Sequence, residues 1–415
     1  MIFDVRDYGA VADGKTLDTK AVQAAVDECF KSGGGRVLIS GGTFLIGTII
    51  LRDNVNLHLA ADGILLGSAD PADFPERTDV KHVDSKMLPR ERNACMIFAE
   101  ESKNISITGE GTIDCNGDNF VEPIVPGSTR AWPFKRIDAP TPPRVVFFTG
   151  CRNITVKDVT MINQPSGWSY WIHDCEYVCF DRIKIEAEVD YPNNDGIHIN
   201  SSRNVTISNC MITCGDDCII VRANNSSLPE NKVCEKVTVT NCNLTSYSGG
   251  IRIGWINDGV IRNCTFSDIV MTDTSVGISI YLPGRDCENR WPDEGREDTL
   301  IEQLSFNNIV MDNMYSAPVF IRVADNKNTR CKAIRNLNFS NIRARCLEMP
   351  YITGRKNCLL KNIYFNNCSF ERMDWNSFER RKFHGALEFW NGEYHPFYVR
   401  YAENVVMNNT DMTIL

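Results

Sequence analysis

The sequence predicts an all-β protein that folds as a parallel β-helix. Short segments in which apolar and polar residues alternate recur along most of the 415 residues, and this period of two is typical of half-buried strands. Equivalent positions follow one another at steps of 22 to 33 residues, as expected of coils that each carry several strands. One step of 45 residues, from Asn263 to Asn308, is interpreted as two coils. The alternating segments are 104–108, 153–157, 204–210, 236–242, 304–308, 336–341 and 362–368.

Asparagine recurs at one position of the repeat. We interpret these residues as a ladder of side-chain amides that hydrogen-bond from coil to coil. Several of them lie in Asn-X-Ser/Thr sequons, and on stacked strands or turns a ladder explains them better than glycosylation does. The sequons include Asn104, Asn153, Asn204, Asn243 and Asn263. Leucine-rich repeats have similar periods, but their Leu and Asn placement differs and no helical apolar stripe separates the strands here.

The chain has 17 cysteines, an odd number, so at least one thiol is unpaired. Asn-Cys pairs recur at Cys210, Cys242, Cys264 and Cys368, which indicates small buried residues that stack in register. Free thiols suit a reducing compartment, and the first residues lack the basic start and apolar core of a signal peptide. We therefore expect a cytoplasmic protein. The alternative is an exported protein whose signal peptide is absent from this sequence.

The N-terminal residues depart from the repeat. Residues 19–30 carry apolar pairs at a helical spacing behind Asp18, and three glycines at 33–35 are expected to end this helix. A helix here would cover the apolar core and the unpaired backbone of the first coil. No linker divides the chain, so we expect one domain over residues 1–415, with an N-terminal cap over about 1–50 and a C-terminal hairpin region over about 371–415. Residues 281–297 are predicted to form a polar insertion between two coils.

Composition excludes several classes of protein. The 23% charged and 9% aromatic residues are typical of a folded chain. A net charge of −9 argues against binding to nucleic acid or to an anionic membrane, although a local basic surface could still bind an acidic sugar polymer. No segment approaches the roughly 20 apolar residues that cross a bilayer. No cofactor is expected, because a nucleotide-binding glycine loop, a zinc-spaced Cys/His set and a serine-nucleophile motif are all missing. The sequence does not predict the oligomeric state.

A second series of aligned segments brings three carboxyl groups together. Asp195, Asp217 and Gly249 occupy equivalent positions at steps of 22 and 32 residues. Because neighbouring strands lie about 4.8 Å apart, we expect Asp195 to stack on Asp217, with Asp216 beside them. Such carboxyl groups raise one another's pKa, and a shared proton keeps one of them protonated near neutral pH, which points to an active site. A Ca²⁺ site is the alternative, since three carboxylates also suit a hard cation.

The motifs around these acids resemble those of glycoside hydrolase family 28, the polygalacturonase family. Asn193-Asn194-Asp195 is similar to its Asn-Thr-Asp motif, and residues 215–218 read Gly-Asp-Asp-Cys like another of its motifs. Residues 163–168 are similar to its Asn-Ser-Pro-X-Trp phrase. The start of the chain resembles the opening segment of the family, which other pectin-lyase-like β-helices share. The resemblance covers about residues 3–370.

The resemblance implies a right-handed parallel β-helix and hydrolysis of a glycosidic bond with inversion. It makes Asp216 the general acid that protonates the leaving oxygen, and it makes Asp195 and Asp217 the pair that positions and deprotonates water. Asn193, beside them, is expected to bind substrate. Stacked coils would place these carboxyl groups closer together than the roughly 6.5–9.5 Å usual for inverting enzymes.

Two motifs of the family are changed. Its Gly-His-Gly motif falls on residues 248–250, which read Ser-Gly-Gly, so the His is absent. Its Arg-Ile-Lys motif falls on residues 279–281, which read Ser-Ile-Tyr, so the two cations that usually hold a galacturonate carboxylate are also absent.

Other residues on the outward faces of these strands are candidates to bind substrate. Alternation points His198, Arg252 and Ser279 outward, and we expect Arg322 to extend the same column. His198, Arg252, Tyr281 and Arg322 are therefore predicted to bind the substrate together with Asn193. Candidate rings for stacking on sugar faces are Trp168, Trp171, Tyr247, Trp255, Tyr281 and Trp291.

Three functions are compatible with these residues. We favour an inverting glycosidase on a galacturonate- or rhamnose-containing pectic glycan, exo-acting on oligosaccharides because the 281–297 insertion could close one end of the site. The second is a polysaccharide lyase with Ca²⁺ at the acids and Arg252 as the base. The third is a non-catalytic, tailspike-like protein that binds glycans. The expected partner in each case is an oligo- or polysaccharide.

Overall fold

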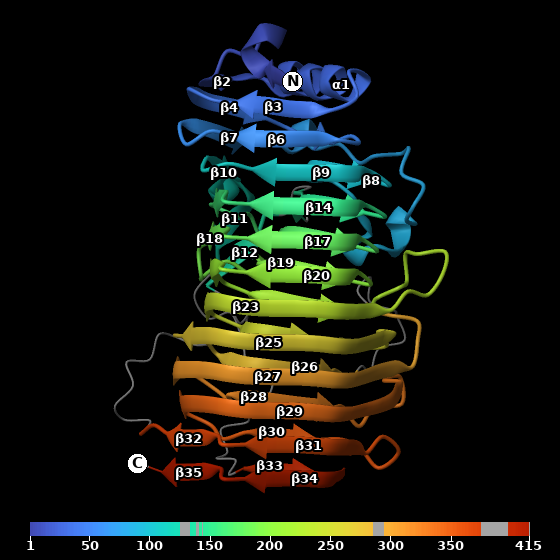
Figure 1. Ribbon diagram of the computed structural model, residues 1–415, viewed down its shortest axis with the longest axis vertical. Coiled ribbons are helices and arrows are strands. Elements are labelled where there is room, and N and C mark those ends of the chain that lie inside the picture. The colour runs from blue at the N-terminus through green and yellow to red at the C-terminus, as the bar shows by residue number, and fades with distance from the viewer. Residues whose placement is uncertain (125–132, 138–140, 143, 285–293, 375–396, 415) are drawn as a thin grey trace.

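The computed structural model describes residues 1–124, 133–137, 141–142, 144–284, 294–374 and 397–414. Along them the chain winds as a right-handed parallel β-helix, with the first coil at one end of the molecule and the last at the other (Figure 1). The all-β prediction is confirmed, since the one α-helix among the described residues is α1 (Thr19–Lys31).

Each coil adds strands to two parallel sheets. Within the described residues, the larger sheet has 22 strands and the smaller one, which we call the site sheet, has 11. The site sheet contains β5 (Ile49–Ile50), β8 (Cys95–Glu100), β13 (Arg144–Thr149), β16 (Trp168–His173), β19 (Ile197–Asn200), β22 (Ile219–Arg222), β24 (Gly249–Ile253), β26 (Val276–Leu282), β28 (Val319–Val323), β30 (Tyr351–Thr353) and β33 (Tyr398–Arg400).

The larger sheet runs the whole length of the coil, and in its later coils two shorter strands continue as one, as where β20 and β21 both pair with β23. Its strands are β1 (Ile2–Asp4), β2 (Asp13–Leu17), β3 (Gly35–Ile39), β4 (Gly42–Ile46), β6 (Val55–Leu59), β7 (Gly63–Gly67), β9 (Lys103–Thr108), β10 (Thr112–Asp114), β14 (Arg152–Lys157), β15 (Thr160–Ile162), β17 (Glu176–Asp181), β18 (Lys184–Glu186), β20 (Arg203–Ser208), β21 (Met211–Cys214), β23 (Cys234–Ser246), β25 (Val260–Thr272), β27 (Thr299–Met314), β29 (Cys331–Cys346), β31 (Leu360–Asn366), β32 (Ser369–Arg372), β34 (Ala402–Asn408) and β35 (Asp411–Ile414). Outside the two sheets lie the antiparallel pair β11 (Val121–Pro123) and β12 (Phe134–Arg136) and the short 3-10 helices Val5–Tyr8, Pro71–Asp73, Ser85–Met87, Pro89–Glu91 and Gly117–Phe120.

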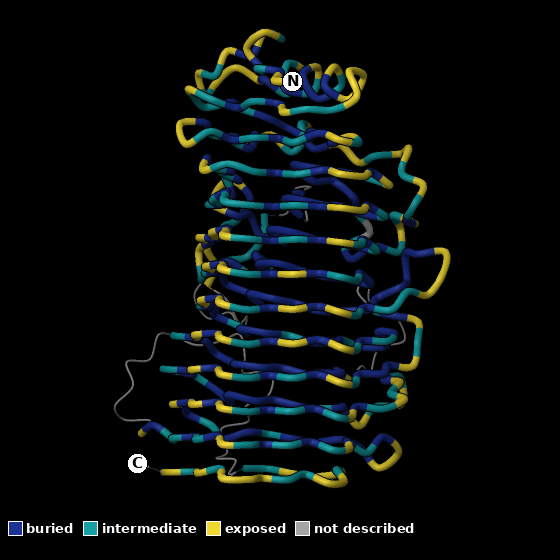
Figure 2. The backbone as a smooth tube through the Cα atoms, viewed as in Figure 1, coloured by how far each residue is buried: buried dark blue, intermediate teal, exposed yellow. Residues whose placement is uncertain are grey.

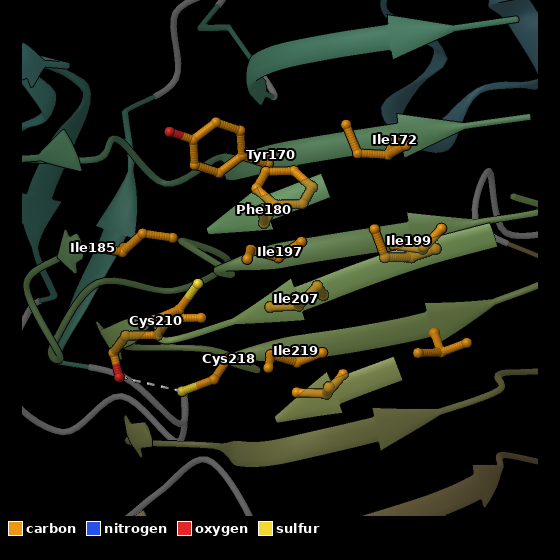
Figure 3. Close-up of a cluster of buried hydrophobic side chains, with 14 of the residues drawn as sticks. Tyr170, Ile172, Phe180, Ile185, Ile197, Ile199, Ile207, Cys210, Cys218 and Ile219 are labelled. Atoms are coloured by element: carbon orange, nitrogen blue, oxygen red, sulfur yellow. Dashed lines mark hydrogen bonds between the residues drawn. The ribbon is translucent and has the colours of Figure 1, made fainter. Parts of the chain in front are cut away.

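Inward-facing isoleucines fix the register of the site sheet. Ile197 pairs with Ile219, Ile219 with Ile251 and Ile251 with Ile278. All four are fully buried, and Figure 3 shows Ile197 and Ile219 on successive strands of the core. Each such side chain gains about 1.5–3 kcal/mol from burial, and a one-residue slip would turn the whole row outward. The register predicted from these residues is confirmed.

The asparagine ladder is also confirmed, and the backbone explains why asparagine is used. Asn104 and Asn153 have φ of 56° and 58°, in the left-handed region that Asn tolerates better than most residues. The Nδ2 of Asn153 donates to the Oδ1 of Asn104 at 2.9 Å, and that of Asn367 donates to Asn341 at 2.6 Å. Alternate residues of the facing strands are buried and exposed, as Figure 2 shows.

One alignment in this ladder was wrong. Strands β23 and β25 pair so that Asn241 lies opposite Asp268 rather than Asn263. Asp268 accepts a hydrogen bond from Asn308 at 2.6 Å, so one coil, not two, connects these positions. This coil is long because it includes the polar insertion, of which residues 285–293 lie outside the described part of the chain.

Helix α1 covers the first coil as predicted. Its Val22 and Val26 are fully buried, and the glycines at 33–35 follow its end with positive φ. Asp18 precedes the helix, but its carboxylate does not cap it. It accepts hydrogen bonds from the backbone N–H groups of Val11 and Ala12 at 2.8 and 3.0 Å, and so holds the loop before β2 against the helix.

The C-terminal hairpin region falls largely on residues 375–396, outside the described residues. The residues that follow add a further coil. Strands β33, β34 and β35 pair in parallel with β30, β31 and β32, respectively.

Most of the described cysteines are buried free thiols. Cys210 and Cys242 stack on adjacent coils as predicted, whereas Cys264 belongs to a different inward-facing row. Cys331 and Cys358 form a disulfide. In the described chain, no helix has the length and apolar character required to span a lipid bilayer.

The outward face of the site sheet is covered over its early strands and opens over its later ones. Val83 and Leu88, from the segment between β7 and β8, form one apolar cluster with aromatic residues of β8, β13 and β16. As a result every residue of β13 and β16 is buried. Strands β24 and β28 differ, because Arg252 and Arg322 on them are partly exposed, although every residue of β26, which lies between them, is buried.

The ladder can be tested at Asn153. We expect Asn153→Ala to lower the free energy of unfolding by about 1–2 kcal/mol, because it loses the hydrogen bond and places Ala in the left-handed region. Asn153→Gly should lose less, since Gly adopts this backbone freely. Urea unfolding of both variants measures the difference, and a glycine variant as unstable as the alanine variant would contradict the backbone explanation.

Candidate active site

The three predicted carboxyl groups lie together, in the turns that lead into β19 and β22. The N–H of Gly196 donates to the carbonyl of Asp217 at 2.9 Å, so Asp195 and Asp217 occupy equivalent places on adjacent coils. Asp216 lies beside them. One carboxylate oxygen of each residue lies within 4.8 Å of the others, which confirms their predicted proximity. We call these three residues the acid cluster.

Close backbone contacts hold the two turns in place. The buried Asn194 accepts a hydrogen bond from the N–H of Gly215 at 2.7 Å and donates to the carbonyl of Glu188 at 2.6 Å. A Cβ at position 215 would lie 2.2 Å from the carbonyl oxygen of Tyr191, and only glycine avoids this clash. Glycine is required at position 196 as well, because a Cβ there would lie 2.3 Å from a backbone oxygen of the next coil. The glycines of both motifs therefore serve to bring the coils together at the acids.

Asp216 and Asp195 are held in a state that favours protonation. Burial, followed by the charge of Asp217, raises the pKa of Asp216 to about 7. Burial, followed by the charges of Asp216 and Asp217, raises the pKa of Asp195 well above its ordinary value. Asp216 accepts hydrogen bonds from the side chain of Asn193 at 3.1 Å and from the N–H of Asp217 at 3.0 Å. The Oδ1 of Asp195 is buried and has no hydrogen-bond partner in the described chain, so it is available to a water molecule or a substrate hydroxyl.

Asp217 is the member of the cluster that carries a counter-charge. The Nη1 of Arg252 lies 2.8 Å from its Oδ2, and the Oγ of Ser248 donates to its Oδ1 at 3.3 Å. Arg252 in turn lies over the ring of Trp255 at 3.7 Å from the ring centroid. A guanidinium held between a carboxylate and an aromatic face is fixed in position.

Gly249 explains why the histidine of the family motif cannot occupy this position. A Cβ on Gly249 would lie 2.4 Å from the Oδ1 of Asp217. Any larger residue would therefore push the Asp217 carboxylate away from Arg252. Because position 249 has no side chain, Asp217 fills the space above it and pairs with Arg252. The absence of the histidine and the presence of Arg252 are therefore linked.

The outward column is confirmed in part. His198 lies on the outward face, with its ring 4.4 Å from that of Trp168, and Arg252 pairs in register with Ser279. Burial, followed by the charge of Arg222, lowers the pKa of His198 well below its ordinary value, so its imidazole is neutral. The prediction that Arg322 continues this column was wrong.

The pairing of β26 with β28 gives the reason for that error. Phe320, not Arg322, pairs with Ser279, and Arg322 pairs with Tyr281. Tyr281 and Arg322 therefore form a second outward-facing column, two residues further along the strands. They lie on later coils than the acid cluster.

The candidate aromatic residues divide into two groups. Trp171 is 2% exposed, stacks on Phe147 and belongs to the covered part of the sheet, and Trp168 and Tyr247 are also buried. Trp255, which is partly exposed, and Tyr281, which is as buried as Trp168, lie beside the two outward arginines, and Trp291 is outside the described residues.

The sequence did not single out the contact of Ser248 with Asp217. It also missed a buried ion pair behind His198, in which Arg222 contacts Asp258 at 2.7 Å. Neither contact is signalled by a sequence motif, so only the packing of the loops could have revealed them.

The raised pKa of Asp216 predicts how stability depends on pH. The folded protein holds the proton more tightly than the unfolded chain does, so this group destabilises the fold progressively as pH rises from its ordinary pKa to about 7. An amide at this position cannot ionise, and Asp216→Asn should therefore be more stable than the wild type at pH 8, by up to about 4 kcal/mol, and nearly equal to it near pH 4. Urea unfolding at both pH values measures this difference in stability. A variant that is less stable than the wild type at pH 8 would show that the ionised carboxyl group does not destabilise the fold there.

Comparison with known proteins agrees with this geometry. Residues 79–377 match the family described as glycosyl hydrolases family 28. A probable polygalacturonase of Vitis vinifera is 30% identical over 285 residues, which cover 66% of this chain but only 55% of that protein. An exopolygalacturonase of Zea mays is 26% identical over 345 residues, 74% of this chain and 76% of its own. The hyperthermoactive exopolygalacturonase from Thermotoga maritima shares the fold, with a TM-score of 0.72 at 21% identity over 100% of this chain and 92% of that one. Because the family match covers well over half of its length, the chain belongs to glycosyl hydrolases family 28.

Proposed function

We propose that this glycoside hydrolase cleaves a pectic glycan of the galacturonate or rhamnogalacturonan type, from one end of an oligosaccharide. The observation that carries the proposal is the acid cluster, in which Asp216, whose pKa is raised to about 7, lies beside Asp217, which is paired with Arg252. The names of its relatives, polygalacturonases and exopolygalacturonases, support the choice of a pectic substrate.

The roles of the three acids follow from their surroundings. Asp216, with a pKa of about 7, can carry a proton at neutral pH and give it to the leaving oxygen as general acid. Asp217 is paired with Arg252, and Asp195 offers an oxygen with no other partner among the described residues. Both can accept a hydrogen bond from one water molecule, and one of them takes the single proton that this water loses as its oxygen attacks the sugar carbon. Attack of this water in a single step inverts the configuration of that carbon.

The acids are closer than the usual spacing of inverting enzymes, as the sequence suggested. Oxygen atoms of the three carboxyl groups lie within 4.8 Å of one another, compared with the roughly 6.5–9.5 Å that leaves room for water between two opposed carboxyl groups. In the proposed arrangement Asp195 and Asp217 hold the water together, and Asp216 lies within the same 4.8 Å of both, so the general acid and the water-holding pair are closer than in that usual arrangement. The anomeric configuration of the first product, read by NMR, distinguishes inversion from retention.

Attack from a chain end is supported by the covered half of the site sheet. The segment before β8 is tied down by Arg144, whose guanidinium donates to the carbonyl groups of Pro89 and Arg92 at 2.8 and 2.5 Å. Its Asp84 N–H also donates to the carbonyl of Ser227 at 2.8 Å, which joins it to the loop after β22. A glycan at the acid cluster can therefore extend over the later coils only. This closure comes from a different segment than the 281–297 insertion, whose residues 285–293 are not described.

The two alternative functions are less well supported. A lyase would use Arg252 as a base. Burial acts to lower the pKa of this guanidinium, but the carboxylate of Asp217 raises it above its ordinary value, so Arg252 is a poor proton acceptor. Its charge also occupies the side of Asp217 that a Ca²⁺ ion would need. A protein that only binds glycans, in turn, has no use for buried carboxyl groups whose pKa values are raised in this way.

The cytoplasmic location stays a prediction. The buried free thiols support a reducing compartment, whereas the Cys331–Cys358 disulfide favours an oxidising one.

The proposal is tested by following the products from defined pectic oligosaccharides and from a long galacturonan. We expect one short product from the earliest time points, with little fall in viscosity, because only chain ends reach the acids. Early products of mixed length would show cleavage within the chain and contradict the exo-acting part. Absence of reducing ends from every galacturonan and rhamnogalacturonan substrate would contradict the pectic substrate.

The same assay includes Asp216→Asn, which should fold normally and lose at least about two orders of magnitude in rate. Asp312→Asn, a partly exposed acid on the larger sheet, serves as the matched control and should keep the wild-type rate. Activity of Asp216→Asn within a few-fold of wild type would refute the assignment of the general acid.

A further inference from the structure

The open half of the site sheet carries a second charged feature, three strands beyond the acid cluster. Arg322 lies on the outward face of β28 and is partly exposed. Its guanidinium lies over the ring of Tyr281, 6.0 Å from the ring centroid. The register continues from Arg322 to Thr353 on β30 and to Arg400 on β33. We call Tyr281, Arg322, Thr353 and Arg400 the basic column.

Arg322 differs from most arginines of this protein in having no anionic partner within the described chain. Arginines on the larger sheet pair with glutamates of the neighbouring coil, as Arg335 does with Glu302 at 2.7 Å and Arg262 with Glu235 at 2.8 Å. Among the described residues Arg322 makes no ion pair and no hydrogen bond, and its ring contact leaves the N–H groups of the guanidinium free to donate. The protein has a net charge of −9, yet the positive charge of Arg322 is not neutralised by a carboxylate of the described chain. Because Arg322 is partly exposed, this charge is available to bind an anionic ligand.

Aromatic rings connect this column to the acid cluster. Arg252 lies over Trp255, and Trp255 meets the edge of Tyr281 at 5.6 Å between centroids. Arg322 lies over the same Tyr281. Tyr281 itself is only 8% exposed and packs with Val276 and Phe320, so its ring supports Arg322 from below, while the guanidinium is partly exposed and can meet a carboxylate.

Arg252 and Arg322 have different tasks. Arg252 is committed to Asp217 at 2.8 Å, and removing it would change the chemistry itself. Arg322 lies three coils after Asp217, which is about 14 Å along the axis, further than one sugar ring reaches from the bond that is cut. It can therefore contribute to recognition without contact with the reacting atoms.

We propose that the basic column is a uronate-binding subsite, in which Arg322, supported by the ring of Tyr281, holds the carboxylate of a sugar residue remote from the cleaved bond. This inference rests on the proposed hydrolysis of a pectic glycan and narrows its substrate to chains with free carboxyl groups at this position. Because the early coils are covered, the subsite belongs to the part of the glycan that extends over the later coils.

Binding to the inactive Asp216→Asn protein tests the subsite without turnover. Calorimetric titrations would compare an acidic tetragalacturonate with its methyl-esterified form, each added to Asp216→Asn and to Asp216→Asn/Arg322→Gln. We expect the second substitution to weaken binding of the acidic chain at least tenfold and to leave binding of the neutral ester unchanged, because a bidentate guanidinium–carboxylate contact is lost. Arg335→Gln, which removes one positive charge from the larger sheet, is the matched control and should change neither affinity.

Kinetics of the active enzyme provide the second readout. In an otherwise wild-type protein, Arg322→Gln should raise KM for the tetramer about tenfold with kcat unchanged, and should not affect a dimer, which is too short to reach the column. Equal affinity of both inactive variants for the acidic chain would overturn the subsite while leaving the hydrolase intact. Equal loss for acid and ester would overturn it as well, since it would show a packing effect. If the wild type cleaved no pectic oligosaccharide at all, the proposed function would fail first, and the subsite with it.

Discussion

The hydrogen-bonded register between successive coils is the constraint on which the site depends. Backbone bonds such as that from Gly196 to Asp217 hold neighbouring coils about 4.8 Å apart, and the inward isoleucines prevent any slip. Carboxyl groups placed on adjacent coils cannot move apart to relieve their repulsion. Burial, together with this repulsion, raises the pKa of Asp216 and of Asp195, as the proposed chemistry needs.

The same register places the covered part and the open part of the site sheet at different positions along the axis of the β-helix. Coils before the acids are closed by the segment that Arg144 ties down, and coils after them carry the partly exposed cations Arg252 and Arg322. At the centre, the absence of a side chain at Gly249 lets Asp217 reach Arg252. This explains how a member of family 28 can lack the histidine and the two cations expected at 279 and 281 and still have a complete acid cluster. The charges lie on neighbouring coils, at Arg252 and Arg322, instead.

Much of this arrangement could be predicted from the sequence, because alternation and spacing report the register directly. The stacking of Asp195 on Asp217 followed from one step of 22 residues between two matching motifs. Errors arose where the pattern is degenerate. A shift of two residues leaves inward and outward faces unchanged, so alternation could not tell that Phe320 rather than Arg322 lies beside Ser279. Asn and Asp suit a left-handed turn equally well, so the sequence pattern placed Asn263 at a ladder position that Asp268 occupies. The closing segment before β8 has no periodicity, and only its packing reveals what it covers.

The dependence of kcat/KM on pH, measured for the wild type and for Arg252→Gln, tests the central claim most directly. The wild type should lose activity as pH rises through about 7, where Asp216 gives up the proton it must donate. Arg252 lowers the pKa of Asp216 and of Asp195, so its removal should move this limb to higher pH by at least about half a unit, whatever the loss in rate. A limb that stays in place, or that moves to lower pH, would show that the carboxyl groups and Arg252 do not titrate as one coupled site.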